Sequence, residues 1–260
     1  MPVKITASRF FYYLKKTVIM DKKFSRVELL TGPSAMQRIR DARVIIFGTG
    51  GVGSWAVESL VRSGIGHLTL VDYDDIDVTN INRQLPATTV TVGKVKTDVM
   101  KRRMLEINPD AEIETRHEFY TAETADSFDL DSYDYVIDAI DSMADKALLI
   151  LNATRSHSRL FSSMGAALKM DPTQVSVAEF WKVEGCPLAA SLRRRFKKEG
   201  VFPARKFKCV YSPELYKNAE SPSSIIDETG KRVNGTVAHT TAIFGFTLAG
   251  LVIEDICNRS

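Results

Sequence analysis

The sequence contains few cysteines, and none of them belongs to a C-x-x-C pair. Cys186, Cys209 and Cys257 are the three cysteines among 260 residues. Their odd number and their spacing suggest neither a disulfide framework nor a four-thiolate zinc site. We therefore expect a protein of the reducing cytoplasm.

Long hydrophobic runs are missing as well. Residues 9–20 hold an apolar run of five residues next to two lysines, which is too short for the core of a signal peptide. In 242–253 about twelve apolar residues follow one another, whereas a helix needs roughly 20 to span a bilayer. We expect no membrane span and interpret 242–253 as part of a buried terminal helix, with membrane association as the alternative.

The chain also lacks an excess of charge of one sign. Its 35 basic and 32 acidic residues leave a net charge of +3, which neither requires nor excludes a polyanionic partner. With 44% hydrophobic residues, the chain is long enough to bury one substantial core. We expect residues 24–260 to form one domain and residues 1–23 to be an N-terminal extension, with disorder of the extension as one option.

Apolar runs alternate with stretches of helical period between Ala42 and Ala167, which is typical of βαβ units. The pattern predicts an α/β fold with a Rossmann-like, doubly wound and mainly parallel sheet. A helix is predicted before Pro109, with a buried stripe of Val95, Val99, Met100, Leu105 and Ile107. The predicted strands are 42–48, 67–73, 111–119, 133–140 and 159–164.

The pattern changes after Pro172. Residues 173–181 alternate like a strand with one exposed face, which predicts a C-terminal extension of antiparallel strands. Residues 187–200 predict a basic helix that begins with proline and ends before glycine. Because 200–235 is rich in Pro, Ser, Lys and Asn, we expect a basic helix and loop insertion over about 182–235.

A glycine-rich loop, GTGGVG, directly follows the first strand and precedes a helix. Its glycines allow a sharp turn and let backbone N–H groups approach a phosphate at the helix N-terminus. Asp72 ends the next strand, where a carboxylate commonly binds ribose hydroxyls. Nucleotide binding is therefore expected through Gly48, Gly50, Gly51, Gly53 and Asp72.

The loop after Asp72 carries more polar groups than a stored dinucleotide needs. Asn80, Arg83 and Gln84 stand close together, and Lys96 follows at the start of the next helix. Two such cations suit a reaction at a triphosphate, where negative charge shifts onto departing pyrophosphate. The alternative is that Arg83 and Lys96 are ordinary surface charges.

Two carboxylates end the fourth predicted strand. Strand carboxyl ends face the ligand crevice in open α/β sheets, so Asp141 is placed to hold the magnesium that accompanies ATP. Asp138 is either a second functional carboxylate or a structural residue that caps a loop.

These motifs, in this order, resemble the ThiF/MoeB class of ubiquitin-activating-type adenylating enzymes. The resemblance implies a homodimer that uses ATP and Mg²⁺ to adenylate a carboxylate, with Arg26 reaching the triphosphate of the partner subunit as an arginine finger. A solvated surface charge is the alternative for Arg26. The implied catalytic residues are Arg26, Arg83, Lys96 and Asp141, and the implied nucleotide-binding residues are Gly48, Gly50, Gly51, Gly53, Asp72, Asp74, Asn80, Arg83, Gln84, Lys96, Asp141 and Ser142.

Segments 163–180, 186–198, 208–214 and 241–253 resemble one subgroup of that class, which acts on threonylcarbamoyladenosine in tRNA. This resemblance implies that the modified nucleoside is dehydrated through an acyl-adenylate, with ATP as the cosubstrate and tRNA as the partner. It also implies a protein of a cysteine-desulfurase system as a further partner and a monovalent cation (Na⁺ or K⁺) as a further cofactor. Adenylation of the C-terminus of a small ubiquitin-like sulfur-carrier protein is the alternative. A nucleotide-binding module without catalysis is a second one.

Charge is concentrated in one segment in spite of the balanced total. Between Arg193 and Lys208 there are eight basic residues and one acid, Glu199. This excess predicts contacts with an RNA backbone. Phe196, Phe202, Phe207 and Tyr211 are interleaved and are candidates for stacking on unpaired bases, whereas a solvated helix face with core phenylalanines is the alternative. Cys209 is expected to be a structural thiol, with an acyl-relay nucleophile as the alternative.

Overall fold

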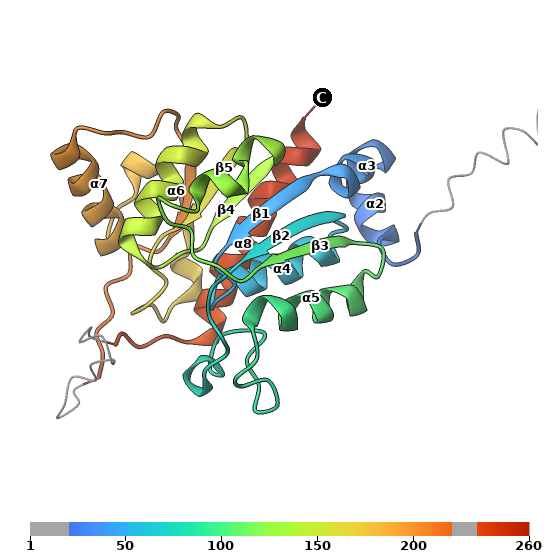
Figure 1. Cartoon of the computed structure of the whole chain (residues 1–260), viewed down its shortest axis with the longest axis horizontal. Helices are drawn as coiled ribbons and strands as arrows, with labels where there is room; N and C mark the ends of the chain where they lie inside the picture. Colours follow the sequence, from blue (N-terminus) through green and yellow to red (C-terminus); the bar gives the residue numbers. More distant parts are fainter. Residues whose placement is uncertain (1–20, 220–232, 260) are drawn as a thin grey trace, which may run out of the picture.

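The computed structural model describes residues 21–219 and 233–259 (Figure 1). They form a seven-stranded sheet in the order β3-β2-β1-β4-β5-β7-β6. All neighbouring pairs are parallel except β6 with β7. The strands are β1 (Arg43–Phe47), β2 (His67–Val71), β3 (Glu112–Arg116), β4 (Tyr135–Asp138), β5 (Arg159–Ser163), β6 (Ser176–Glu179) and β7 (Lys208–Tyr211).

The predicted α/β class and the five predicted parallel strands are confirmed. Each strand is shorter than the pattern indicated, because the chain leaves the ladder early and turns into the loops at the carboxyl edge of the sheet. The helices are α2 (Ser25–Thr31), α3 (Pro33–Asp41), α4 (Gly53–Arg62), α5 (Lys96–Ile107), α6 (Met143–Arg155), α7 (Pro187–Glu199) and α8 (Ala238–Asn258).

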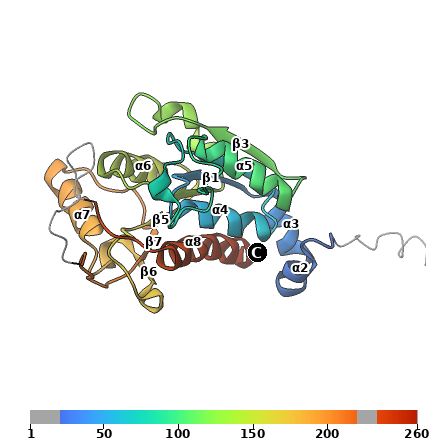
Figure 2. The same cartoon turned by 90° about the horizontal axis from the view of Figure 1, so that it is seen from below.

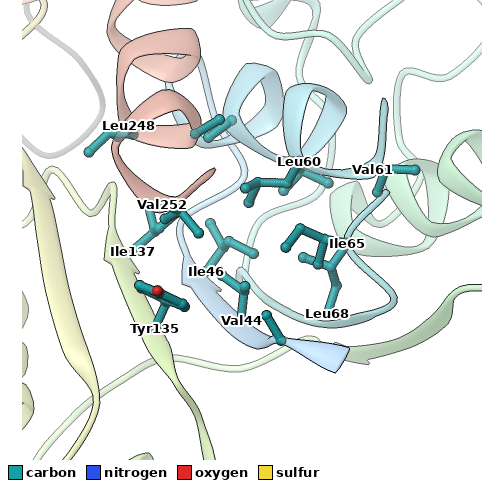
Figure 3. Packing of buried hydrophobic residues seen from close by; sticks show 14 of the residues in the cluster. Val44, Ile46, Leu60, Val61, Ile65, Leu68, Tyr135, Ile137, Leu248 and Val252 are labelled. Carbon is teal, nitrogen blue, oxygen red and sulfur yellow. The ribbon is translucent and has the colours of Figure 1, made fainter. Parts of the chain in front are cut away.

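Both faces of the sheet are covered, and β1 shows why its sequence is apolar from Val44 to Phe47, after an exposed Arg43. Val44 and Ile46 point into one cluster with residues of α3, α4, α5 and α8 (Figure 3). Ile45 and Phe47 point into a second cluster with residues of α6 and α7. Successive side chains of a strand alternate between faces, so a strand buried on both sides needs no polar residue.

The prediction for the C-terminal extension is wrong in one respect. β6 is antiparallel as expected, but β7 runs parallel to β5 and lies between β5 and β6. It therefore belongs to the main sheet, although 200–235 was expected to be a loop or insertion. The strand escaped notice because it has four residues and exposed Lys208 at its start.

The predicted buried stripe of α5 is only partly correct. Met100 is fully buried, but Met104 is the other fully buried apolar residue of this helix. Leu105 and Ile107 are partly buried against the same cluster. Because α5 covers the outer strands of the sheet, one narrow line of its side chains is enough to shield the sheet face below from water.

The terminal helix α8 is long and apolar enough to cross a membrane by length and composition, and 56% of its most apolar window is buried inside the protein. Phe244, Leu248 and Val252 lie in the same core cluster as Leu60 of α4. Figure 2 shows α8 running beside α4 under the sheet. The helix thus serves as a core element, as its sequence predicted.

Candidate active site

The glycine loop lies between the carboxyl end of β1 and the start of α4. Gly48 has φ +88°, and a Cβ there would stand 2.7 Å from the carbonyl oxygen of Ala139. A Cβ on Gly53 would stand 1.8 Å from the carbonyl oxygen of Gly48. Side chains at these positions would push the loop open. The turn directs the free N–H groups of the first helical turn towards an anion.

Asp72 follows β2 and is almost fully buried beside this loop. Its Oδ2 accepts hydrogen bonds from the backbone N–H of Thr49 at 2.6 Å and from the Thr49 hydroxyl at 3.0 Å. Its Oδ1 accepts from the N–H of Asp74 at 3.0 Å. One carboxylate therefore fixes the glycine loop and the loop after β2 in the same place, where a ribose would lie.

Lys96 is the first residue of α5, and its side chain is 4% exposed. Its ammonium makes an ion pair with the Oδ2 of Asp74 at 2.5 Å. An isolated charge so deeply buried would be costly, and the carboxylate offsets part of that cost. Asp74 is itself 40% exposed, so a ligand at the carboxyl edge of the sheet can reach the pair. We call the ligand-facing side of the glycine loop, the loop after β2 and the loop of Asp141 the crevice, because ligands bind at this edge in open α/β sheets.

Arg83 is half-buried, and both its guanidinium and its backbone carbonyl are hydrogen-bonded to neighbours. Its guanidinium donates to the carbonyl oxygen of Thr79 at 2.9 Å and to Oδ1 of Asn82 at 3.0 Å. The indole N–H of Trp55 on α4 donates to the Arg83 carbonyl at 3.1 Å. Burial lowers the pKa of this guanidinium, and the nearby charge of Asp141 opposes that effect. Arg83 and Asp141 therefore face the same crevice.

Asn80 and Gln84 are buried below Arg83. Oδ1 of Asn80 accepts the N–H of Asp77 at 3.1 Å and so caps a short 3₁₀ turn. Gln84 lies against Gly50, and its Oε1 has no hydrogen-bond partner in the described part of the chain. A buried amide oxygen left in this way is available to a ligand donor.

The two carboxylates after β4 have different surroundings. Asp138 is fully buried, lies 2.8 Å from the ammonium of Lys146 and accepts from the Ser162 hydroxyl at 2.6 Å. Asp141 is exposed at the crevice. Asp138 is therefore structural, which resolves the alternatives that the sequence left open.

Lys146 was missed by sequence reasoning, yet it shapes the loop that carries Asp141. Its ammonium also donates to the carbonyl oxygen of Ile140 at 2.9 Å, and the Ile140 N–H donates to Asp138 at 3.2 Å. These bonds fix the residue directly before Asp141. The signal in the sequence is a lysine directly before the apolar run 147–151.

A model of the ThiF family matches residues 24–259. This chain belongs to the ThiF family. A Haemophilus influenzae relative named tRNA threonylcarbamoyladenosine dehydratase is 38% identical over 92% of this chain and 95% of its own length. A Bacillus subtilis protein of the same name is 40% identical over 90% of this chain and 94% of its own length. The solved Escherichia coli enzyme of that name, in complex with ATP, superposes with a TM-score of 0.82, at 36% identity over 92% of this chain and 97% of that structure.

The ThiF-type fold gathers all but one of the residues predicted for the site at the carboxyl edge of β1, β2 and β4. Ser142 is among them, at the N-cap of α6, where its side chain makes no capping hydrogen bond. The gathered residues are Gly48, Gly50, Gly51, Gly53, Asp72, Asp74, Asn80, Arg83, Gln84, Lys96, Asp141 and Ser142.

Arg26 is not brought to the site within one chain. It lies exposed on α2, next to Phe24, which packs against the position of Gly64 beyond the far end of α4. The glycine loop is at the other end of that ten-residue helix, about 15 Å away. Within one copy of the chain, Arg26 is therefore too far from the glycine loop to contact a nucleotide bound there.

Tyr73 is an aromatic residue beside Asp72 and Asp74 that the sequence motifs do not include. Its ring stacks on Phe119 with centroids 3.5 Å apart, and both side chains are half-exposed. Burial, then Asp74, Asp141 and Asp72, raise the pKa of Tyr73 to about 12. These charges place the ring beside the carboxylates of the crevice.

The basic segment is less uniform than its sequence. Phe196 and Phe207 are core residues, so neither can stack on a base. The guanidinium of Arg205 donates to four backbone carbonyl groups, and that of Arg193 donates to one. Cys209 is fully buried on β7, and burial raises the pKa of its thiol well above the ordinary value. A buried neutral thiol is a structural residue.

Proposed function

We propose that this protein is an ATP-dependent tRNA threonylcarbamoyladenosine dehydratase. The observation that carries the proposal is the crevice, where a glycine loop, Asp72, Arg83 and Lys96 converge with the exposed carboxylate of Asp141. Relatives of that name match almost the whole length of the chain, and one of them was solved with ATP. A tRNA substrate agrees with the cytoplasmic location that the cysteine content predicts.

In the proposed reaction, the carboxylate of the threonylcarbamoyl group attacks the α-phosphorus of ATP, and pyrophosphate leaves. A nucleophile of the same modified nucleoside then attacks the acyl carbon and displaces AMP, so that a ring closes. The nucleoside loses one water in total. The attacking group is tethered, which gives the step the advantage of an intramolecular reaction without an enzyme nucleophile.

The charged residues of the crevice divide this work. Arg83 and Lys96 stabilise negative charge on the phosphates and on departing pyrophosphate. Asp72 orients the ribose. Asp141 fits as a ligand of Mg²⁺, because that ion is commonly bound through one or two carboxylates together with substrate phosphates. Mg²⁺ held there supplies charge neutralisation at the triphosphate.

Arg26 completes the site only in a homodimer. On α2 it shares one helix face with Leu29 and Leu30, which are 77% and 86% exposed. An apolar face of this kind is buried when it packs on another copy, and Arg26 is then carried to the neighbouring crevice. Mixing an Arg26→Ala chain with an Asp141→Ala chain tests this arrangement. Partial activity of the mixture is expected, whereas two inactive parents and an inactive mixture would contradict it.

The alternative of a sulfur-carrier substrate is less well supported. The sequence lacks the two C-x-x-C pairs that hold zinc in many such enzymes, and Cys209 is inaccessible as a relay nucleophile. A monovalent cation and a cysteine-desulfurase partner are expectations of the resemblance alone.

The decisive experiment is mass spectrometry of nucleosides from tRNA that carries threonylcarbamoyladenosine, incubated with the protein, Mg²⁺ and ATP. The expected result is loss of one water from that nucleoside, dependent on ATP. A reaction without ATP serves as the control. If the nucleoside stays unchanged while the protein exchanges pyrophosphate into ATP with a carrier protein, the alternative substrate is correct.

A further inference from the structure

Helix α7 connects the two edges of the sheet. Near its start, Leu188 packs 3.7 Å from the Cβ position of Gly165, which follows β5 at the carboxyl edge. It ends at Gly200, and β7 then begins at the amino edge. Thirteen helical residues span about 20 Å. The basic end of α7 therefore lies on the edge opposite the nucleotide crevice, as Figure 1 shows at the upper left.

The cations at this amino edge fall into two groups. In the first group, Arg193 and Arg205 are bound to backbone carbonyl groups, Arg194 donates to the Ser191 hydroxyl at 3.2 Å, and Arg195 is paired with Glu199 at 2.9 Å. A second group is exposed, and none of its members makes an ion pair with another residue of 21–219 or 233–259. This group consists of Lys182, Lys197, Lys198, Lys206 and Lys208.

Two exposed aromatic rings lie among these lysines. Trp181 follows the end of β6, Phe202 follows the end of α7, and their ring centroids are 6.1 Å apart. They are 38% and 50% exposed, although the neighbouring Phe180 is fully buried. A cavity of about 550 Å³ at the same edge is lined by Lys206 and Lys208, and also by the carboxylates Glu179 and Asp255. Exposed aromatic rings between unpaired lysines are the combination that binds unpaired bases and phosphates.

We propose that this amino-edge surface is the RNA-backbone grip of the protein, and that it contacts nucleotides several steps away from the reacting adenosine. The lysines neutralise phosphates, and Trp181 with Phe202 receives an unpaired base. The proposal rests on the proposed function, since the substrate must be RNA. The surface consists of Trp181, Lys182, Lys197, Lys198, Phe202, Lys206 and Lys208.

The place of this surface, on the edge opposite the nucleotide crevice, gives the proposal a distinctive consequence. The grip raises affinity for a complete tRNA but does not touch ATP or the modified nucleoside. Its loss should therefore raise the KM for tRNA and leave the KM for ATP unchanged. A structural role of the same residues would change both values together.

The test compares Lys197→Gln/Lys198→Gln with Lys101→Gln/Arg102→Gln, which removes the same charge from α5. Binding of tRNA is measured by electrophoretic mobility shift at several salt concentrations. Two lost phosphate contacts should lower the slope of log K against log salt by about 1.8 and weaken binding about 10-fold or more at low salt. The α5 variant should bind tRNA like the unchanged protein.

A second variant, Phe202→Ala, separates RNA from other polyanions. It should weaken tRNA binding about 10-fold, because stacking on a base is lost. Its binding of inorganic polyphosphate, which has no bases, should not change. If the α7 and α5 variants bind tRNA equally well, the proposed RNA-backbone grip is wrong. In that case, dehydration by the unchanged protein would still support the proposed function. Absence of dehydration by the unchanged protein would overturn both.

Discussion

The two edges of the sheet use cations in opposite ways. At the carboxyl edge, Lys96 and Arg83 are buried or half-buried, and each is held by neighbours at fixed distances. At the amino edge, Lys197 and Lys198 are exposed and without ion pairs among the described residues. Cations held at fixed positions stabilise charge at defined atoms, whereas free lysines attract a backbone without fixing its position. Cations of the same charge therefore suit a reaction site at one edge and a binding surface at the other.

The largest difference between the edges is expected for single carboxylates. Asp141→Ala should lower turnover about 1000-fold, which corresponds to about 4 kcal/mol of lost transition-state stabilisation. Asp41→Ala removes a carboxylate beside the amino edge and should leave turnover unchanged. Turnover is measured from AMP release, and circular dichroism verifies the fold. Equal rates for both variants would show that Asp141 is not part of the reaction.

Removing a buried cation should cost stability, unlike removing an exposed one. Lys146→Met leaves Asp138 buried without its partner and should lower the free energy of unfolding by about 3 to 5 kcal/mol. Lys197→Gln should change it by less than about 0.5 kcal/mol. Denaturant unfolding measures both.

A double variant, Lys146→Met with Asp138→Leu, sharpens this comparison. It removes the buried charge as a pair and should regain most of the stability. The KM for ATP should stay raised, because the bond to the Ile140 carbonyl is missing and the loop of Asp141 is no longer fixed. Recovery of both quantities would mean that Lys146 does not position that loop.

Two glycines with positive φ allow a matched test of the two edges. Gly48→Ala and Gly200→Ala both place a side chain in a left-handed conformation, at a cost of about 1 to 2 kcal/mol. Only at Gly48 does the new Cβ meet a backbone oxygen, that of Ala139. We expect a raised KM for ATP in Gly48→Ala and an unchanged one in Gly200→Ala. A raised KM in both would point to a general effect on folding.

The smallest effect is expected within the sheet, between the edges. Cys209→Ala should retain most of the activity, because this thiol is fully buried and its pKa is raised by burial. Iodoacetamide near pH 8 should label the partly exposed Cys257 faster than Cys209. Loss of turnover in a folded Cys209→Ala protein would assign the thiol a catalytic role.

The sequence predicted the βαβ core well because the hydrophobic periodicity along the chain is enough to locate its strands and helices. The strands, the glycine loop and the polar loop after Asp72 could be placed from apolar runs and turn residues. β7 could not be found in this way, since four residues with an exposed lysine gain strand character only from the ladder bonds with β5 and β6. The same holds for Lys146, whose partner is eight residues away in the chain.

By itself, the sequence determined which chemical groups stand at the end of each strand, because local spacing fixes that order. Tertiary structure alone decided which charges are free. Asp138 is bound inside while Asp141 is exposed, and the exposed Arg205 is bound to backbone carbonyl groups while the exposed Lys206 makes no ion pair with the described residues. It also decided that Arg26 and the basic end of α7 lie away from the crevice. The physical reason is that hydrogen bonds and burial depend on neighbours brought together by folding, which spacing along the chain does not record.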